Sequence, residues 1–533
     1  MDNGDYFAHS ANGAGAWHRL SDHLASVARR AREHAGAAPW REEAHLAGEM
    51  HDIGKYGDRF QARLQGRDSG LDHWSLGAWL TIRDHRALAA ALAIEGHHIG
   101  LQRGDKGSLR RLLPDNLKAN HPLRLSLSDE DPDRLISRAR ADGLSFAKPR
   151  TVALTSWEKA IAAMLDVRLL FSCLVDADFL DTEAHFNGDA AGKKPRELGP
   201  GLDARAALDA LEAYMGEAVR STSRAETQVR EAREALWNAC IGAAQAEPGC
   251  FTLTAPTGSG KTLAMLRFAL EHAARNNLKR IVVAVPYLTI IEQTARVYRA
   301  LFESFPENFV LEHHSLAGLG DESEKQDAEG EQERQRRLLA ENWDAPIVLT
   351  TNVQLLESLF SNRPSACRKL HNLMEAVVLF DEAQSLPQDL AVPTLAALSH
   401  LSSAYRSTVV FATATQPAFD ALHQAVTAHA VSGWRPMEAI PDHPRLFEAL
   451  ARVRVCWPAP GERRTWEDLA GVLRSTEQAM CVVNLKRHAR TFRSPDLAPG
   501  SAPPEGGKPP IDTEGCMSSA GNSRACLVTS VGF

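Results

Sequence analysis

The chain has few cysteines, and they do not form a metal or disulfide pattern. Its 533 residues include 8 Cys, which are scattered without a Cys-x-x-Cys pair. Such usage fits a reducing cytoplasm better than an oxidised scaffold. Apolar runs of membrane-span length are also lacking, and the first ten residues, MDNGDYFAHS, resemble no signal peptide. We therefore expect a cytoplasmic protein without a membrane partner.

An excess of charge of one sign is likewise absent. The 60 Lys and Arg residues stand against 67 Asp and Glu, a formal net charge of −7. This balance excludes a globally basic surface for nucleic acid but allows a local basic groove. Hydrophobic residues make up 44% of the chain, which excludes wholesale disorder and collagen-like classes. A chain of this length is expected to form two to four domains.

Residues 1–215 are predicted to form an all-α domain. Apolar residues recur at helical spacing from Leu20 to Ala31, and residues 157–174 carry a second helical stripe. Few β-branched runs occur here. The segment Gly188–Pro200 is rich in Gly, Pro and Lys, which is typical of a loop.

The pattern changes in the second predicted domain, residues 216–440. Short apolar runs alternate with helical stretches, which predicts an α/β domain with a parallel sheet covered on both faces. The predicted strands are residues 250–254, 280–285, 346–350, 376–380 and 408–412.

The remaining sequence is predicted to contain a second, incomplete α/β lobe and a tail. An apolar run at residues 480–484 would be the first strand of that lobe, which we place at residues 441–493. Residues 494–533 hold six Pro, six Gly and six Ser without periodicity, a composition typical of disorder.

A glycine-rich segment follows the first strand of the second domain. Residues 255–262 read APTGSGKT, the pattern of a phosphate-binding loop between a strand and a helix. Gly258 and Gly260 would let backbone N–H groups approach phosphates. Lys261 would reach the β- and γ-phosphates of ATP, and Thr262 would bind Mg²⁺. The predicted nucleotide-binding residues are Thr257, Gly258, Ser259, Gly260, Lys261, Thr262, Asp381 and Glu382.

Two acidic residues end the strand predicted at residues 376–380. Carboxylates at the end of a buried strand are costly unless they serve a site. We expect Asp381 to hold Mg²⁺ through water and Glu382 to orient or deprotonate the attacking water.

Five segments of this domain resemble motifs of superfamily 2 helicases. They read APTGSGKT, VPYLTIIEQT (285–294), LTTNVQLLESL (349–359), DEAQ (381–384) and FATATQP (411–417). The resemblance implies that Thr413 and Thr415 couple hydrolysis to movement along DNA, and that the second and third segments contact the DNA backbone.

Histidine and aspartate recur in short phrases of the first domain. Imidazole and carboxylate ligands together suit first-row transition metals, and a carboxylate shared by two ions serves phosphodiester hydrolysis. Each phrase alone is weak evidence, but the ordered set on a helical domain is stronger. The predicted metal ligands are His23, His51, Asp52, His73, His97, His98 and Asp178.

This ordered set resembles the HD phosphohydrolase superfamily. Together with Gly96-His97-His98 and the helicase segments, it is similar to the CRISPR-associated HD nuclease–helicase of type I interference systems. The resemblance implies two metal ions bridged by Asp52: one held by His23, His51, Asp52 and Asp178, the other by Asp52, His73, His97 and His98. Lys55 would contact the scissile phosphate, and the implied catalytic residues are Asp52, Lys55 and Glu382. Asp176 competes with Asp178 as the last ligand, and His9, His18 and His85 are interpreted as structural or surface residues.

The resemblance also implies cofactors, partners and an activity. A pair of Mn, Ni, Co or Fe ions would serve hydrolysis of single-stranded DNA, and ATP with Mg²⁺ would drive 3′-to-5′ translocation. Recruitment would be by an RNA-guided CRISPR surveillance complex. The motifs expected after residue 493 are not found, so we interpret the tail as a frameshift or premature end that impairs the helicase. Two alternatives stay open: an HD nucleotide phosphohydrolase with a regulatory ATPase, and a non-catalytic DNA-binding or nucleotide-binding remnant.

Overall fold

The structure is a computed structural model of the whole chain. It describes residues 5–146, 148–150, 158–189, 192–221, 227–314, 331–451, 465–475, 480–481 and 527–528. The chain divides into two compact units, Met1–Leu446 and Phe447–Phe533. Among the described helices, none is both long and apolar enough to span a membrane.

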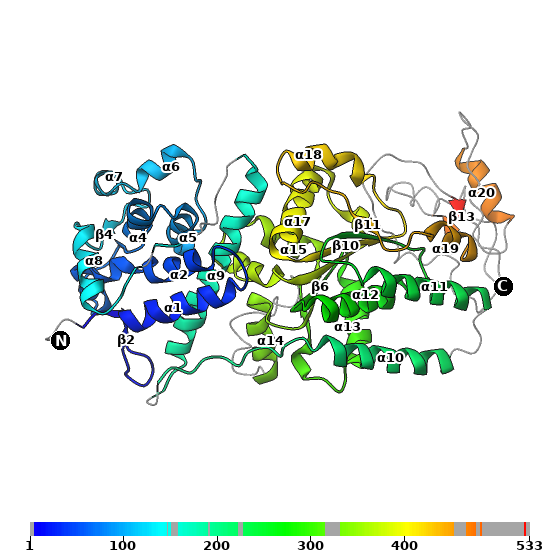
Figure 1. Ribbon diagram of the computed structural model, residues 1–533, viewed down its shortest axis with the longest axis horizontal. Coiled ribbons are helices and arrows are strands. Elements are labelled where there is room, and N and C mark those ends of the chain that lie inside the picture. Colours follow the sequence, from blue (N-terminus) through cyan, green and yellow to red (C-terminus); the bar gives the residue numbers. More distant parts are fainter. Residues whose placement is uncertain are drawn as a thin grey trace. The chain divides into compact units, whose positions relative to one another are not determined.

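The first part of unit 1 is helical, as the sequence predicts (Figure 1). Its core is formed by α1 (Leu20–His34), α2 (Arg41–Met50), α5 (Leu88–Ile99) and the 27-residue α9 (Ala160–Phe186), which pack against one another. The shorter elements are β1 (Phe7–His9), β2 (His18–Arg19), η1 (Ile53–Tyr56), α3 (Asp58–Leu64), β3 (Leu71–Asp72), α4 (Ser75–Leu80), η2 (Thr81–His85), α6 (Lys106–Arg111), α7 (Pro114–Ala119), β4 (Ser126–Leu127) and α8 (Pro132–Ala141).

Helices α1 and α2 pack so closely that only glycine fits at one position. A Cβ atom on Gly48 would lie 2.4 Å from the Ala28 Cα atom and 2.5 Å from its nitrogen. Both are backbone atoms, so the helices themselves must move apart to admit a side chain. This close approach brings His23 on α1 near the end of α2, where His51 follows.

Gly48→Ala is therefore expected to destabilise the protein by about 1–3 kcal/mol, the usual cost of overpacking a core. The matched control is Gly242→Ala on α11 (Thr227–Ala243), where a Cβ atom meets nothing within 4 Å. That change should be neutral or stabilising, because alanine favours helix. Thermal unfolding followed by circular dichroism measures both effects. An unchanged melting curve for Gly48→Ala would show that the two helices separate easily.

The second part of unit 1 is a seven-stranded parallel sheet, which confirms the predicted α/β domain. The strand order is β11-β5-β10-β9-β6-β8-β7, and the paired strands are all parallel. The strands are β5 (Cys250–Thr254), β6 (Arg280–Val285), β7 (Val310–His313), β8 (Ile347–Thr351), β9 (Ala376–Asp381), β10 (Thr408–Thr413) and β11 (Met437–Glu438). Five of them match the predicted strands to within one residue. Strands β7 and β11 were not predicted, because they lie at the sheet edges and carry few apolar residues.

Helices cover both faces of this sheet (Figure 1). One face is covered by α10 (Ala204–Ser221), α11, α12 (Lys261–Asn276) and α13 (Leu288–Leu301). The other is covered by α15 (Asn352–Phe360), α17 (Ala391–Tyr405) and α18 (His423–Thr427). The remaining elements are η3 (Glu307–Phe309), α14 (Glu331–Asn342), α16 (Pro364–Cys367), η4 (Leu370–Leu373), η5 (Ala383–Ser385), η6 (Gln388–Leu390), η7 (Phe419–Leu422) and α19 (His443–Ala449).

Helix α9 joins the helical domain to the sheet domain. It packs against α1 and α5 on one side and against α16, α17 and η4 on the other. Its buried residues consequently fall on all sides of the helix rather than on one stripe. Polar contacts cross the same boundary: Trp40 Nε1 donates to Tyr405 Oη at 2.8 Å, and His400 Nε2 lies 2.6 Å from Asp166 Oδ1.

Little of unit 2 lies within the described residues. Helix α20 (Trp466–Arg474) is described, and β12 (Met480–Cys481) pairs antiparallel with β13 (Leu527–Val528). Of the predicted second lobe at residues 441–493, the structure describes residues 441–451, 465–475 and 480–481, and of the predicted tail at residues 494–533 it describes residues 527–528. The rest of both predictions lies outside the described residues.

Candidate metal centre and nucleotide site

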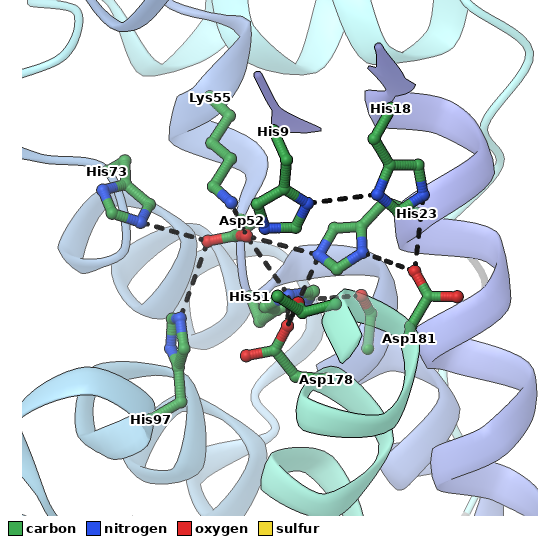
Figure 2. Close-up of polar contacts among 12 residues, drawn as sticks. His9, His18, His23, His51, Asp52, Lys55, His73, His97, Asp178 and Asp181 are labelled. Atoms are coloured by element: carbon green, nitrogen blue, oxygen red, sulfur yellow. Dashed lines mark hydrogen bonds and ion pairs between the residues drawn. The ribbon is translucent and has the colours of Figure 1, made fainter. Parts of the chain in front are cut away.

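Most of the predicted metal ligands surround Asp52, as Figure 2 shows for His23, His51, His73, His97 and Asp178. Asp52 lies between the end of α2 and the start of η1. The ligands reach it from five places in the chain: His23 on α1, His51 after α2, His73 after β3, His97 and His98 on α5, and Asp178 on α9. Segments spread over more than 150 residues of sequence thus converge on one carboxylate.

The two oxygens of Asp52 face different histidines. Oδ2 lies 3.5 Å from His23 Nε2 and 3.4 Å from His51 Nε2. Asp178 Oδ1 closes this side, at 3.5 Å and 3.7 Å from the same two nitrogens. The arrangement corresponds to the first predicted ligand set.

The second predicted set lies on the opposite oxygen. Asp52 Oδ1 is 3.4 Å from His73 Nε2 and 3.6 Å from His97 Nε2. His98 Nε2 approaches His73 Nε2 at 2.9 Å, and these four residues form one group with metal-ligand spacing. Asp52 therefore occupies the bridging position between the two sets.

Hydrogen bonds orient three of these imidazoles from behind. His51 Nδ1 donates to the Gly48 carbonyl at 2.8 Å, and His97 Nδ1 donates to the Ile94 carbonyl at 2.7 Å. His23 Nδ1 donates to Asp181 Oδ2 at 2.8 Å. With Nδ1 bonded to these acceptors, the Nε2 atom of each ring faces the carboxylates, the orientation found in metal sites.

Several buried polar atoms of the cluster face one another without a hydrogen-bond partner among the described residues. Within the described residues, Asp52 Oδ1 and the Nε2 atoms of His23, His51 and His97 have no hydrogen-bond partner. Buried acceptors that converge in this way require a shared proton or a cation. The donor set of imidazoles and carboxylates fits transition-metal ions.

The electrostatics of the cluster favour positive charge. Burial alone would raise the pKa of Asp52, but Lys55 and His51 hold it well below its usual range. Burial alone would lower the pKa of His51, but Asp52 and Asp178 raise it to about 10. The same negative field that holds a proton on His51 would stabilise a metal ion in its place.

Lys55 lies at this site rather than apart from it. Its Nζ is 2.6 Å from Asp52 Oδ2, and the residue is 5% exposed. A buried lysine beside the predicted ligands places positive charge at this site. Its contact with a phosphate stays a prediction.

The structure separates the two competing aspartates of α9. Asp178 faces the cluster, whereas Asp176 pairs with Arg368 Nε at 3.0 Å. Two positions along a helix correspond to a rotation of about 200°, so the two side chains point to opposite sides. The geometry selects Asp178 as the neighbour of His23 and His51.

One residue of the site was missed from the sequence, and three histidines were interpreted as either structural or surface residues. Asp181 was missed, although it follows Asp178 by three positions and so shares a helix face with it. His18 is not a surface residue: it is 3% exposed, and its Nε2 lies 3.4 Å from Asp181 Oδ2. His9 Nδ1 lies 3.1 Å from His18 Nδ1 beside the His23 ring. His85 is buried at the end of η2, as a structural residue would be.

The predicted phosphate loop connects β5 to the N-terminus of α12. Gly258 and Gly260 have φ values of +79° and +88°, which residues with a side chain rarely adopt. Thr262 follows Lys261 in the first turn of the helix, and the exposed Thr257 begins the loop. The Ser259 hydroxyl is buried without a hydrogen-bond partner among the described residues. Free backbone N–H groups at such a helix end fit a phosphate.

The acidic residues meet the loop at the same edge of the sheet. Lys261 Nζ lies 2.9 Å from Asp381 Oδ1 and 2.7 Å from Glu382 Oε1. Burial would raise the pKa of Glu382, but Lys261 holds it below its usual range. A lysine, two carboxylates and a helix N-terminus form the donor set that Mg²⁺ and a nucleotide triphosphate require.

Thr413, the last residue of β10, and Thr415, just after the strand, contact the same region. Thr413 Oγ1 hydrogen-bonds Gln384 Oε1, and the Thr415 nitrogen donates to Thr413 Oγ1 at 3.1 Å. The DEAQ and FATAT segments are therefore in direct contact, which connects the nucleotide site to the end of β10.

Comparison with known proteins agrees with this geometry. Residues 236–422 match the DEAD/DEAH box helicase family. The helicase domain implies the use of ATP and Mg²⁺ at the site just described.

Two further comparisons extend over most of the chain and so include the helical domain. The chain is 28% identical to the CRISPR-associated nuclease/helicase Cas3 of Haloferax volcanii, over 76% of this chain and 49% of that protein. The crystal structure of T. fusca Cas3 has a TM-score of 0.52 and 17% identity, over 80% of this chain and 51% of that one. Its AMPPNP complex gives 0.51 and 16%, over 80% and 52%. The chain thus has a Cas3-like multidomain fold and spans about half the length of these relatives.

Proposed function

We propose that this chain is a metal-dependent nuclease of single-stranded DNA coupled to an ATP-dependent 3′-to-5′ DNA helicase. It would degrade invader DNA in type I CRISPR defence, together with an RNA-guided surveillance complex. The observation that carries the proposal is the cluster around Asp52, which shares a compact unit with the helicase domain. The Haloferax volcanii relative, whose name joins nuclease and helicase, supports the same pairing.

The nuclease site would divide its tasks among its residues. The histidines, Asp52 and Asp178 would hold two Mn, Ni, Co or Fe ions, and the two oxygens of Asp52 face the two groups of histidines. Such ions polarise phosphodiester oxygens and lower the pKa of bound water. Lys55 would bind the phosphate that is cleaved, and Asp181 would keep His23 in the orientation that a ligand needs.

The ATPase site would exchange one set of ion pairs for another. Without nucleotide, the Lys261 charge is balanced by Asp381 and Glu382. ATP would draw Lys261 to its phosphates, which frees Asp381 to hold Mg²⁺ and Glu382 to orient water. The hydrogen bond between Thr413 and Gln384 would transmit this rearrangement of ion pairs to the segments proposed to contact DNA.

The proposal is tested with circular single-stranded DNA and the full chain. We expect cleavage with Mn²⁺, Ni²⁺ or Co²⁺ in the absence of ATP, and its loss on chelation. Deoxynucleotides and double-stranded circles serve as comparison substrates. Hydrolysis of nucleotides with the circles left intact would favour the nucleotide phosphohydrolase instead, and neither reaction would favour a binding remnant.

Asp181→Ala is expected to weaken metal binding at the Asp52 cluster by about 10- to 100-fold, the usual effect of removing a residue that orients a ligand. The matched control is Lys193→Ala, which removes the 2.8 Å ion pair to Asp181 but keeps the Asp181–His23 hydrogen bond. Competition with a chromophoric chelator measures both affinities. Equal losses in the two variants would show that Asp181 acts only through its ion pair.

A further inference from the structure

Residues 101–125 form a basic segment that begins just after the predicted metal ligands of α5 and contains α6 and α7 (Figure 1). It holds six Lys or Arg residues against two Asp, a formal charge of +4 with histidine neutral, in a chain whose net charge is −7. All six cations are exposed: Arg103, Lys106, Arg110, Arg111, Lys118 and Arg124. A concentration of positive charge on one surface attracts an anionic partner.

Neighbouring acids do not neutralise these cations. Among the described residues, only Lys118 of the six has an ion-pair partner, and its Nζ lies 3.9 Å from Glu130 Oε2. Arg111 donates to the neutral Ser108 hydroxyl at 2.8 Å. Asp105 instead caps the start of α6, where it accepts from the Ser108 nitrogen at 3.1 Å. The segment thus keeps most of its positive charge available to a ligand.

The two ends of the segment lie beside two predicted metal ligands. The segment starts three positions after His98. Near its other end, His121 Nε2 lies 2.7 Å from Oδ2 of Asp72, the residue directly before His73. Strand β4, which follows, pairs parallel with β3, the strand that ends at Asp72. The backbone therefore holds the segment next to both His73 and His98.

The Asp52 cluster reaches solvent at His98, next to the start of the segment. In the second predicted ligand set, Asp52, His73 and His97 are buried, whereas His98 is exposed. His98 Nε2 lies 2.9 Å from His73 Nε2, so the exposed ring belongs to the same group as the buried ones. A substrate that enters the cluster at His98 therefore meets the basic segment beside it.

The start of the segment is also joined to the sheet domain. The Leu101 nitrogen donates to the Asn362 carbonyl at 2.8 Å, and Asn362 Nδ2 donates to the Leu101 carbonyl at 3.3 Å. A Cβ atom on Gly100 would lie 2.8 Å from the same Asn362 oxygen, so the two chains touch. Asn362 comes just after α15, which carries most of the helicase-like segment at residues 349–359. The basic segment therefore adjoins both a predicted DNA-contacting helix and the Asp52 cluster.

We propose that residues 101–125 bind the backbone phosphates of single-stranded DNA and guide the strand from the end of α15 to the opening at His98. This role rests on the proposed nuclease function. Lys and Arg side chains that neutralise phosphates release counterions, so such binding depends on salt but not on base sequence. The position of the segment favours nucleic acid over an acidic protein, because contacts to phosphates are what position a strand at a site.

Binding of DNA without cleavage tests the proposal. The test variant of the full chain replaces three cations of the segment: Lys106→Gln, Arg110→Gln and Arg124→Gln. Anisotropy of a fluorescent oligothymidine is followed at several salt concentrations, with EDTA and without ATP. The slope of log affinity against log salt should become shallower by about 2, since each phosphate contact on a single strand contributes about 0.7. Affinity at about 0.1 M salt should fall about 10- to 100-fold.

Two matched variants distinguish local contact from general charge. The first removes three exposed cations near the ends where strands of the sheet begin, and it should bind DNA as the wild type does: Arg275→Gln, Lys279→Gln and Arg435→Gln. The second keeps the charge of the segment and should also bind as the wild type does: Lys106→Arg, Arg110→Lys and Arg124→Lys. An unchanged slope and affinity in the test variant, or equal weakening in the first control, would overturn the proposal.

Cleavage distinguishes this proposal from the proposed function on which it rests. With saturating Mn²⁺, the test variant should raise KM for circular single-stranded DNA by about the factor by which affinity falls. It should leave kcat near wild type, because the Asp52 cluster is intact. A wild-type chain that loses salt dependence on mutation of the segment but cleaves nothing would contradict the nuclease and still support DNA binding by the segment. A wild-type KM in the test variant would contradict the role of the segment alone.

Discussion

Asp52→Asn is expected to lower the rate of single-stranded DNA cleavage by more than about 100-fold. The substitution keeps the shape of the side chain but removes the charge that faces four histidine nitrogens at 3.4–3.6 Å. Loss of a residue that only orients a ligand weakens a metal site by about 10- to 100-fold, so loss of the shared carboxylate should exceed that. Cleavage of circular DNA with Mn²⁺ and without ATP is the measurement.

The control for this variant is another buried aspartate of the same domain. Asp129 is 4% exposed and pairs with Arg134 rather than with a histidine. Asp129→Asn removes a buried charge and should lower stability but leave the cleavage rate of the folded protein near wild type. Cleavage that survives in Asp52→Asn, at metal concentrations that saturate the wild type, would contradict the assignment of this cluster.

Lys261→Ala is expected to lower ATP hydrolysis by about 100-fold or more. The reason is that one hydrogen-bond donor positioned to stabilise the negative charge of a transition state contributes about 100-fold or more to the rate. It also leaves Asp381 and Glu382 without their common cation, so two negative charges face the incoming phosphates. Release of phosphate and binding of a fluorescent ATP analogue with Mg²⁺ are the measurements, and both should fall.

A surface lysine of the same domain provides the control. Lys279 pairs with Glu375 and its side chain is 58% exposed, so Lys279→Ala should leave both measurements unchanged. Lys261→Ala should also leave DNA cleavage without ATP unchanged, and Asp52→Asn should leave ATP binding unchanged. If either variant disabled both sites, the two chemistries would share residues, which the geometry excludes.

The sequence by itself determined the kinds of chemistry present. Buried parallel strands read as continuous apolar runs, so five strands were located to within one residue. The phosphate loop was recognisable because its backbone conformation requires glycines within a short contiguous segment. Two of them, Gly258 and Gly260, have the expected positive φ. The ordered histidines and aspartates predicted which residues would gather at Asp52, since each lies in a short sequence motif that can be recognised by itself.

Tertiary structure alone decided how those residues are arranged. It separated Asp178 from Asp176, because a helix of 3.6 residues per turn sends neighbours two positions apart to opposite sides. It placed Asp181 and His18 behind His23, and it brought His371 beside His34 from another domain. Such pairings have no local signature, because they depend on how α1, α9 and the sheet pack together. The sequence shows which potential ligands the chain contains. Their distances and hydrogen bonds, which make a site of them, depend on how the helices pack.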